Sequence, residues 1–316
     1  MNIRQLQYIT EVVKQRLNIS AAAKELHTSQ PGVSKQIRLL ETEVGAQIFV
    51  RAGNKVTGVT AFGELILPPA QRILADVAFV KAAAKDLHKQ NAGTLVVATT
   101  HTQAHYVLPE VMKRFAKKNP KVRLVQRLGT PLQIAEFVQS GEADIGVTTN
   151  VSTLSSQLVP LPYRKFERIL IVPLGHELLK KGRITLKMLA RYPLVSYDPA
   201  YTGHQHIVAA FQCVGLVPNI ALSASDADVI KACVEQDFGI GVLLEVAFDS
   251  KRDTGLQGIS AGHLFQPAMV SIVLQRNHYL RSYCYDFIEM LSARWSRSNV
   301  QAAISSFRPS TNASGP

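Results

Sequence analysis

Four hydrogen-bonding side chains stand close together where an apolar segment gives way to a helical pattern: Thr99, Thr100, Thr102 and Gln103. Their hydroxyl and amide groups, with the unpaired N–H groups at a helix start, could together bind an anion. Hydrogen bonds to a charged acceptor contribute about 1.5 to 3 kcal/mol each, so neutral donors suffice for this chemistry. Each threonine could instead be only a cap or strand residue. As a group, the four residues predict a binding site for a small anion.

A second set of candidate contacts lies in residues 19–41, ISAAAKELHTSQPGVSKQIRLLE, a pattern typical of two short helices joined by a polar turn. Val33, Ile37 and Leu40 recur at spacings of four and three, so they face inward. An ordinary helical hairpin with a solvated basic face is the alternative. The positions left to meet base edges or phosphates in a major groove are Gln30, Ser34, Lys35 and Arg38.

Two further basic residues flank a predicted turn just after this helix pair. The segments 47–51 and 55–60 lie on either side of Ala52-Gly53-Asn54 and predict a small two-stranded wing. Arg51 and Lys55 would then contact phosphates beside the groove.

The 316-residue chain carries a formal net charge of +12, and residues 1–60 hold eight basic against four acidic side chains. A basic surface attracts polyanions by counterion release, although net charge alone does not separate DNA from RNA or acidic lipid. The sequence has no apolar run of about 18 residues and no signal-peptide core, so we expect a cytoplasmic protein with no membrane partner. Three distant cysteines argue against a disulfide framework or a zinc site.

Two histidine pairs raise the question of a metal site. His101 and His105 are four residues apart at a predicted helix start, and His204 and His206 flank a glutamine. No cysteine or carboxylate completes a ligand set at a known spacing. We therefore expect no metal and no cofactor.

Asp226 and Asp228 have the spacing of an acid and base pair, but Ser225 followed three residues later by Asp228 is also a capping box. No nucleophile or metal set accompanies the two carboxylates, so we favour the cap and expect no enzyme activity. Gly239-Ile240-Gly241 resembles part of a dinucleotide fingerprint but lacks its third glycine, which favours close packing of a strand.

The elements that would position the basic residues are helical. Residues 3–13 form an amphipathic pattern that completes a three-helix core with the helix pair. Residues 61–90 predict a long helix, which Pro68-Pro69 should kink or break near Leu67. Its apolar positions alternate spacings of four and three, and we favour dimerisation along this coiled-coil seam over a helix lying on its own domain. The seam positions are Ile73, Val77, Val80, Ala84 and Leu87.

From residue 91 onward, strands and helices alternate, which predicts an α/β fold with parallel sheet. Ligands in such folds bind at the carboxyl ends of strands. A capping box at residues 130–133 opens one of the helices. The tail from 301 to 316 should lack structure. The predicted strands are 94–99, 122–127, 143–148, 168–172, 193–197, 219–224, 239–243 and 270–274, and helices include 101–118 and 280–295.

A winged helix-turn-helix, a long helix and two α/β lobes resemble the LysR-type transcriptional regulators over nearly the whole chain. Five motifs carry a closer resemblance to the CysB and Cbl subgroup: ATTHTQAHYVLPEV at residues 98–111, TSQPGVSKQIR, FVRAGNKVTGVT, YTGHQ and SDADVIK. The resemblance implies a DNA-binding domain at 1–60, a linker and dimerisation helix at 61–90, and a two-lobed, periplasmic-binding-protein-like effector domain at 91–300. Lobe I would comprise 91–163 and 269–300, and lobe II 164–268.

This resemblance also implies function. The chain would bind promoter DNA as a homodimer or homotetramer, contact RNA polymerase, and control genes for sulfate assimilation, cysteine synthesis or organic sulfur use. Its effector would be sulfate, adenylyl sulfate or acetylserine. Similar proteins bind sulfate or a small acylated serine with residues that match Thr100, Thr102, Gln103, Thr149 and Thr202 of this sequence.

Two residues depart from the subgroup pattern. His105 and His204 stand where arginine is expected, so a permanent charge is replaced by one that titrates near neutrality. We therefore expect effector choice to differ, or binding to strengthen at lower pH. The competing classes are a solute-binding or enzymatic α/β protein with an incidental helical head, and a nucleoid or RNA-binding protein without sequence preference.

Overall fold

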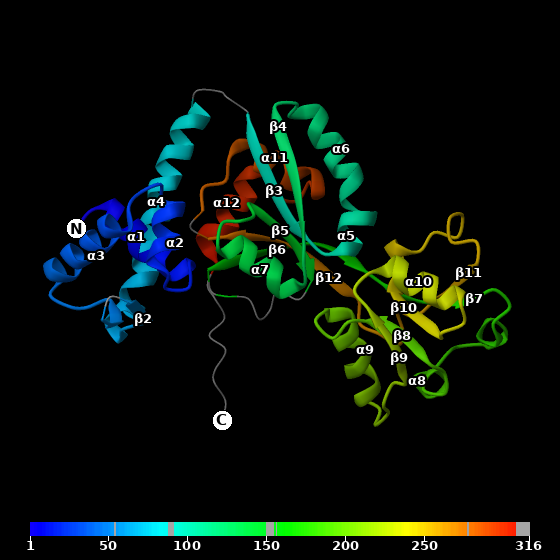
Figure 1. Ribbon diagram of the computed structural model, residues 1–316. Helices are drawn as coiled ribbons and strands as arrows, with labels where there is room; N and C mark the ends of the chain where they lie inside the picture. The colour runs from blue at the N-terminus through cyan, green and yellow to red at the C-terminus, as the bar shows by residue number, and fades with distance from the viewer. Residues whose placement is uncertain (54, 88–91, 150–154, 156, 277, 308–316) are drawn as a thin grey trace. The chain divides into compact units, whose positions relative to one another are not determined.

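The computed structural model describes residues 1–53, 55–87, 92–149, 155, 157–276 and 278–307. The chain divides into two compact units, which are described separately (Figure 1). One comprises Met1–Lys89 and Asn277–Tyr279, and the other comprises Gln90–Arg276 and Leu280–Pro316. No helix in the described part of the chain has the length and hydropathy that crossing a bilayer would require.

The first unit is built on three short helices, as predicted. They are α1 (Ile3–Lys14), α2 (Ile19–Glu25) and α3 (Gln30–Val44). Asparagine side chains cap the first two helices: Asn2 accepts from the N–H of Gln5 and Asn18 from that of Ala21. The buried faces of the three helices meet in one core that includes Ile9, Ala22 and Val33.

The sequence signals around α3 are confirmed. Ser29 is the N-cap residue and accepts from the N–H of Gly32, while proline occupies the first turn. Val33, Ile37 and Leu40 are all buried. Gly45 closes the helix in the left-handed conformation at φ 72°, which glycine adopts without a Cβ penalty.

The predicted wing also forms. Strands β1 (Phe49–Ala52) and β2 (Lys55–Val59) pair antiparallel, and α4 (Ala61–Leu87) follows. Of the kink or break expected near Leu67, the break is wrong, because α4 runs through both prolines; a kink there stays a prediction. A proline has no N–H, so the carbonyl four residues earlier loses its helical hydrogen bond. For Pro68 and Pro69 these are the carbonyls of Glu64 and Leu65. Both of these residues are exposed, so water can satisfy their carbonyl groups.

The two halves of α4 differ in their surroundings. Leu67 and Ala70 are buried in the core of the first unit. Further along, the seam residues Ile73 and Val80 are 39% and 65% exposed. The side chain of Leu87 lies outside the described ones. Dimerisation through this seam stays a prediction, supported by apolar side chains that this copy of the chain leaves uncovered.

The second unit contains two five-stranded sheets, each forming one lobe. The sheet of lobe I has the order β4-β3-β5-β12-β6, and helices cover both of its faces. Its strands are β3 (Gly93–Thr99), β4 (Val122–Leu128), β5 (Ile145–Thr149), β6 (Leu158–Phe166) and β12 (Ala268–Gln275). Its helices are α5 (His101–Tyr106), α6 (Leu108–Lys118), α7 (Pro131–Gln139), α11 (Ser282–Leu291) and α12 (Arg297–Ser306).

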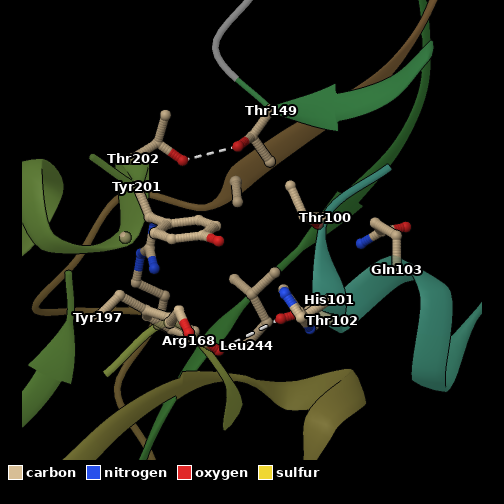
Figure 2. A pocket seen from close by; sticks show the side chains of 13 residues that line it. Thr100, His101, Thr102, Gln103, Thr149, Arg168, Tyr197, Tyr201, Thr202 and Leu244 are labelled. Carbon is tan, nitrogen blue, oxygen red and sulfur yellow. Dashed lines mark hydrogen bonds between the residues drawn. The ribbon is translucent and has the colours of Figure 1, made fainter. Parts of the chain in front are cut away.

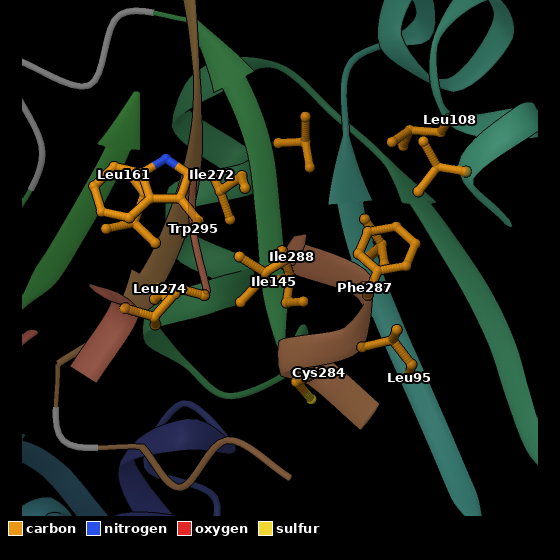
Figure 3. Close-up of a cluster of buried hydrophobic side chains, with 14 of the residues drawn as sticks. Leu95, Leu108, Ile145, Leu161, Ile272, Leu274, Cys284, Phe287, Ile288 and Trp295 are labelled. Atoms are coloured by element: carbon orange, nitrogen blue, oxygen red, sulfur yellow. The ribbon is translucent and has the colours of Figure 1, made fainter. Parts of the chain in front are cut away.

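The largest core lies on one face of the lobe I sheet, beneath α6, α11 and α12 (Figure 3). Leu95 and Ile145 from the strands meet Phe287 and Ile288 of α11 there, and all four are buried. On the opposite face α7 covers a smaller cluster. The predicted capping box opens α7, with Thr130 and Gln133 each accepting from the backbone N–H of the other.

Lobe II has the sheet order β11-β7-β10-β8-β9. Helices α8 and α9 pack on one face and α10 on the other. Its strands are β7 (Arg168–Pro173), β8 (Leu194–Tyr197), β9 (Ile220–Ala224), β10 (Ile240–Leu244) and β11 (Leu256–Ser260). Its helices are η1 (Glu177–Lys180), α8 (Leu186–Leu189), α9 (Thr202–Gln212), α10 (Ala227–Glu235) and η2 (Glu245–Ala247).

Neither sheet is purely parallel, which corrects the prediction. In lobe I, β12 pairs antiparallel with β5 and β6; in lobe II, β7 pairs antiparallel with β10 and β11. Strands β6 and β11 were not predicted. β6 carries Pro160 and Pro162, which argue against a central strand but are tolerated at a sheet edge, where β6 lies.

Three further boundaries differ from the predictions. The helix expected at 101–118 is interrupted at Val107, just before Pro109, which has no N–H to continue the ladder. The tail was expected to lack structure from residue 301, but α12 extends to Ser306; residues 308–316 lie outside the described part. Strand β6 continues to Phe166, so lobe I extends three residues beyond the expected limit at 163.

Gly241 confirms the expected close packing. A Cβ built on it would lie 2.5 Å from Cγ1 of Ile171 on the neighbouring strand β7. The glycine pair at 239–241 therefore serves sheet packing.

Candidate functional site

A pocket lies between the two lobes, where the end of β3 faces the start of α9 (Figure 2). Lobe I contributes Thr100, His101, Thr102, Gln103 and Thr149 to its walls. Lobe II contributes Arg168, Tyr197, Tyr201, Thr202 and Ser225. The cavity has a volume of about 40 Å³, room for a few water molecules or one small oxyanion.

The donors of α5 are available to a ligand. Thr100 is the N-cap residue of α5, but its hydroxyl makes no capping hydrogen bond. Gln103 is buried, and its Oε1 accepts from the Tyr163 hydroxyl at 2.9 Å. This bond orients the amide so that its nitrogen points toward Thr100 (Figure 2). The N–H groups of the Gln103 amide are therefore directed into the pocket.

Two pairs of hydroxyl groups join the lobes across the pocket. Thr149 Oγ1 and Thr202 Oγ1 are 2.6 Å apart, and Thr102 Oγ1 lies 3.4 Å from the Tyr197 hydroxyl. Burial raises the pKa of Tyr197 to about 12, so this hydroxyl is neutral at pH 7. Thr149 and Thr202, which only the family resemblance indicated, thus line the same cavity as Thr100 and Thr102.

Thr99 is the predicted site residue that the structure does not bring to the pocket. Its side chain is fully buried, and its hydroxyl donates to the carbonyl of Val147 on β5 at 3.0 Å. This bond fastens β3 to its parallel neighbour. The geometry therefore gives Thr99 a structural role.

Arg168 lines the pocket but was absent from the sequence-based candidates. It opens β7, and its side chain is 1% exposed. Its Nε donates to the carbonyl of Gln266 at 3.2 Å, and one terminal nitrogen lies 3.3 Å from Nδ1 of His206. A single arginine opening the apolar strand segment RILIV was the signal that could have identified it.

The histidines that depart from the subgroup pattern do not line the pocket. Nδ1 of His105 lies 2.8 Å from Oδ2 of Asp228, and Nδ1 of His204 lies 3.0 Å from the carbonyl of Tyr197. Neither histidine is therefore placed to contact a ligand in the pocket directly. His101 does line the pocket, and its Nδ1 is 3.3 Å from Oδ2 of Asp226.

An aspartate caps α10, but the expected capping box of Ser225 and Asp228 is wrong, because the N-cap residue is Asp226. Asp226 accepts from the backbone N–H of Asp228 at 2.6 Å, which leaves the side chain of Ser225 at the pocket. Within the described residues no group of three histidine, cysteine or carboxylate side chains could hold a metal ion.

The predicted DNA contacts gather on one face of the first unit. A shallow hollow is lined by Gln30, Ser34, Lys35, Arg38 and Arg51. Lys35 and Arg38 are exposed, as base or phosphate contacts require. Lys55 is exposed on β2 but does not line the hollow.

Arg51 has a partner that the sequence did not reveal. Its guanidinium forms a salt bridge to Oε2 of Glu41 at 3.2 Å. Oε1 of Glu41 also accepts from the N–H groups of Ile48 and Phe49. Arg51 and Glu41 therefore tie the wing to α3.

These features define a DNA-binding protein whose second unit holds a ligand pocket between two α/β lobes. The profile described as "LysR substrate binding domain" matches residues 88–296, and "Bacterial regulatory helix-turn-helix protein, lysR family" matches residues 3–64. The chain belongs to the LysR family of transcriptional regulators. Regulators of this family bind promoter DNA and small-molecule effectors and form oligomers.

Three relatives illustrate the similarity. The transcriptional regulator SsuR of Burkholderia cenocepacia is 41% identical over 95% of this chain and 97% of its own length. CysB of the same organism is 42% identical, over 96% and 97%. The crystal structure of the cofactor-binding domain of the Cbl regulator superposes with a TM-score of 0.66 at 37% identity, covering 69% of this chain and 96% of that domain.

Proposed function

We propose that this regulator controls genes for sulfate assimilation, cysteine synthesis or organic sulfur use. Its effector is sulfate, adenylyl sulfate or acetylserine, bound in the pocket between the lobes. Similarity to SsuR, CysB and Cbl over nearly the whole chain supports this assignment. The observation that carries it is the pocket itself, where hydroxyl, amide and guanidinium groups converge.

The hydrogen-bond donors and the positive charge in the pocket favour an anion. Thr100, Gln103 and Thr149 supply neutral donors from lobe I, and Arg168 supplies a positive charge from lobe II. No aspartate or glutamate is among the described residues that line the cavity. A negatively charged ligand would therefore gain hydrogen bonds without facing a carboxylate.

On the output side, we assign base and phosphate contacts to the exposed face of α3. The protein would act in the cytoplasm. The side chains that would enter the major groove of the DNA are those of Gln30, Ser34, Lys35 and Arg38. Lys55 and Arg51 would contact the phosphate backbone of the DNA. Contact with RNA polymerase at the promoter completes the proposal.

Ligand binding to the full-length protein tests the effector assignment. A ligand of the folded state raises the melting temperature by mass action, so sulfate, adenylyl sulfate and N-acetylserine are titrated separately. The variant T149V loses one hydrogen bond to a charged ligand. Its affinity for whichever of the three compounds binds the wild type should therefore fall about tenfold. T94V carries the same substitution at an exposed position of β3 and should behave like the wild type.

Absence of a melting shift with all three compounds would contradict the effector assignment. A separate fluorescence anisotropy titration at fixed salt, with promoter DNA from a sulfur-assimilation gene and with unrelated DNA, tests the regulatory role. Equal affinity for the two DNA molecules would contradict sequence-specific regulation.

A further inference from the structure

One segment of lobe II, residues 177–191, is far more basic than the rest of that lobe. It connects β7 to β8 and contains η1 and α8. The segment holds five basic side chains against one carboxylate, whereas the remainder of residues 167–267 holds four basic against nine acidic side chains. The five basic residues are Lys180, Lys181, Arg183, Lys187 and Arg191. Positive charge is therefore concentrated on one part of an otherwise acidic lobe.

The apolar residues of this basic segment fix its backbone to the lobe. Leu178, Ile184 and Leu189 are buried in the core that α9 covers. The carbonyl of Ile184 also lies 2.8 Å from Nε2 of His263. No large apolar side chain of residues 177–191, all of which the structure describes, is exposed. The segment thus presents a polar, charged surface on a backbone that is held in place.

The charges of the basic segment are not neutralised by neighbouring carboxylates. All five basic side chains are exposed, and none forms a salt bridge with another described residue. The carboxylate of Glu177, the one acidic group in the segment, accepts from the Tyr192 hydroxyl at 2.6 Å. The five charges are therefore available to a polyanion.

The composition of the segment indicates which polyanion it fits. Protein interfaces are depleted in lysine and are centred on apolar or aromatic side chains. The basic segment offers three lysines and no exposed large apolar side chain. Lysine and arginine contacts to phosphates, by contrast, hold a protein on DNA without reading the base sequence. The phosphate backbone of DNA is therefore favoured over an acidic protein.

We propose that residues 177–191 form a second DNA-contacting surface, which binds backbone phosphates in addition to the contacts of α3. Once α3 holds the DNA, phosphates are present at a high effective concentration for the rest of the same chain, so even a weak contact contributes. DNA repels the acidic remainder of lobe II, so the basic segment determines which face of the lobe turns toward the duplex.

The salt dependence of DNA binding tests this surface on the full-length protein. Fluorescence anisotropy measures affinity for a labelled duplex of about 60 base pairs of arbitrary sequence, between about 50 and 200 mM KCl. In the triple variant K180Q/K181Q/K187Q, the slope of log affinity against log salt should become shallower by about 2 to 3, since each lost phosphate contact removes about 0.9. K113Q/K117Q/K121Q, the same charge change at exposed lysines of α6 and the turn after it, should keep the wild-type slope.

Lysine footprinting gives a second readout that needs no variant. The duplex should slow acetylation of Lys180, Lys181 and Lys187, measured by mass spectrometry, and leave that of Lys113 unchanged. An unchanged slope in K180Q/K181Q/K187Q would overturn the DNA contact, as would equal losses in the two triple variants. If the slope stayed unchanged while binding to purified RNA polymerase holoenzyme was lost, the basic segment would bind an acidic protein, and the DNA contact would be wrong.

Discussion

Thr99 and Thr100 are neighbours with the same side chain, yet only Thr100 lines the pocket. Successive side chains of a strand point to opposite faces, and Thr99 at the end of β3 turns its hydroxyl toward the carbonyl of Val147. One position later the backbone enters the cap of α5, and the hydroxyl of Thr100 is left without a capping bond. The two threonines thus differ in role because Thr99 ends the strand and Thr100 begins the cap of the helix.

Substitution of a single residue, Arg38, can test the proposed DNA contacts. It is exposed on α3 and lines the hollow with Lys35, so it can reach a base edge. Replacing Arg38 with alanine should cost about 1 to 3 kcal/mol of DNA-binding free energy and relax specificity at one base pair. Anisotropy titrations against operator variants measure both effects. An unchanged affinity together with an unchanged specificity profile would contradict a base contact by Arg38.

The sequence indicated the threonines and the glutamine of the pocket but not Arg168, Tyr197 or Tyr201. Polar residues at a strand-to-helix junction are a local signal, so Thr100, Thr102 and Gln103 could be found without a structure. Arg168 lies far from them in sequence, and its burial follows from the packing of lobe II. That burial is a property of the tertiary fold, which no local pattern reveals.

At the scale of elements, Glu41 connects the recognition helix to the wing. Its side chain is 9% exposed, and it accepts two backbone N–H groups and the guanidinium of Arg51. The start of β1 is therefore held against α3 by one buried carboxylate. Local sequence patterns indicated both elements but not this bond between them.

Removing that carboxylate should destabilise the first unit. We expect Glu41→Ala to lower the free energy of unfolding by about 1.5 to 3 kcal/mol, because hydrogen bonds to a charged acceptor are lost and two donors lose their partner. Urea denaturation of the full-length protein measures the change. Glu43→Ala, at an exposed position of the same helix, should change it by less than about 0.5 kcal/mol. Equal effects of the two substitutions would contradict the role of Glu41.

Asp228 plays a comparable part between the lobes. From lobe I, the Tyr106 hydroxyl donates to its Oδ1 at 2.5 Å and Nδ1 of His105 lies 2.8 Å from Oδ2. Lys231 of α10 lies 2.8 Å from Oδ1. Burial alone would raise the pKa of Asp228, but the hydrogen bonds from Lys231 and Tyr106 and the charge of Lys231 lower it below its ordinary value.

The lowered pKa of Asp228 in the folded state determines how the stability of the protein changes with pH. The ionised carboxylate stabilises the folded state above its unfolded pKa of about 3.9, and this contribution is lost as pH falls through the lower folded value. Wild type should therefore be more stable than Asp228→Asn between pH 5 and pH 7. The difference should shrink below about pH 4. Thermal unfolding at each pH measures it, and a difference that grew on acidification would refute the assigned charge.

The elements themselves were predicted unevenly, for physical reasons. Helices with capping boxes or a capping serine, such as α3 and α7, carry local signals and were found. Strand β6 was missed because its two prolines are acceptable only at a sheet edge, and edge position is set by the whole sheet. The antiparallel direction of β7 and β12 likewise depends on where the chain crosses between the lobes.

At the scale of the whole molecule, an effector in one unit can alter DNA binding by the other only by favouring one of two states. The lobes are joined at the pocket through Thr149 with Thr202 and through Thr102 with Tyr197. A ligand that entered there would compete with or reinforce these contacts, and would thereby favour one arrangement of the lobes over another. Reciprocally, operator DNA should change effector affinity by the same factor.

Dimerisation is the remaining whole-molecule requirement, since two half-sites about one DNA turn apart need two recognition helices. The second half of α4 carries Ile73 and Val80 on its predicted seam, both exposed in a single copy. A charge at this seam would be buried against a second helix, which is unfavourable. Val80→Asp should therefore shift the mass measured by analytical ultracentrifugation toward the monomer and weaken binding to a two-half-site operator.

Leu65 offers the matched control for that experiment. It is an exposed apolar residue of the same helix, but its spacing from Ile73 and Val80 places it outside the seam. Leu65→Asp should keep the wild-type mass and operator affinity. Both variants should still bind a single half-site as the wild-type monomer does, because α3 is untouched. If Val80→Asp remained oligomeric with full operator affinity, copies of the chain would have to associate through a surface other than this seam.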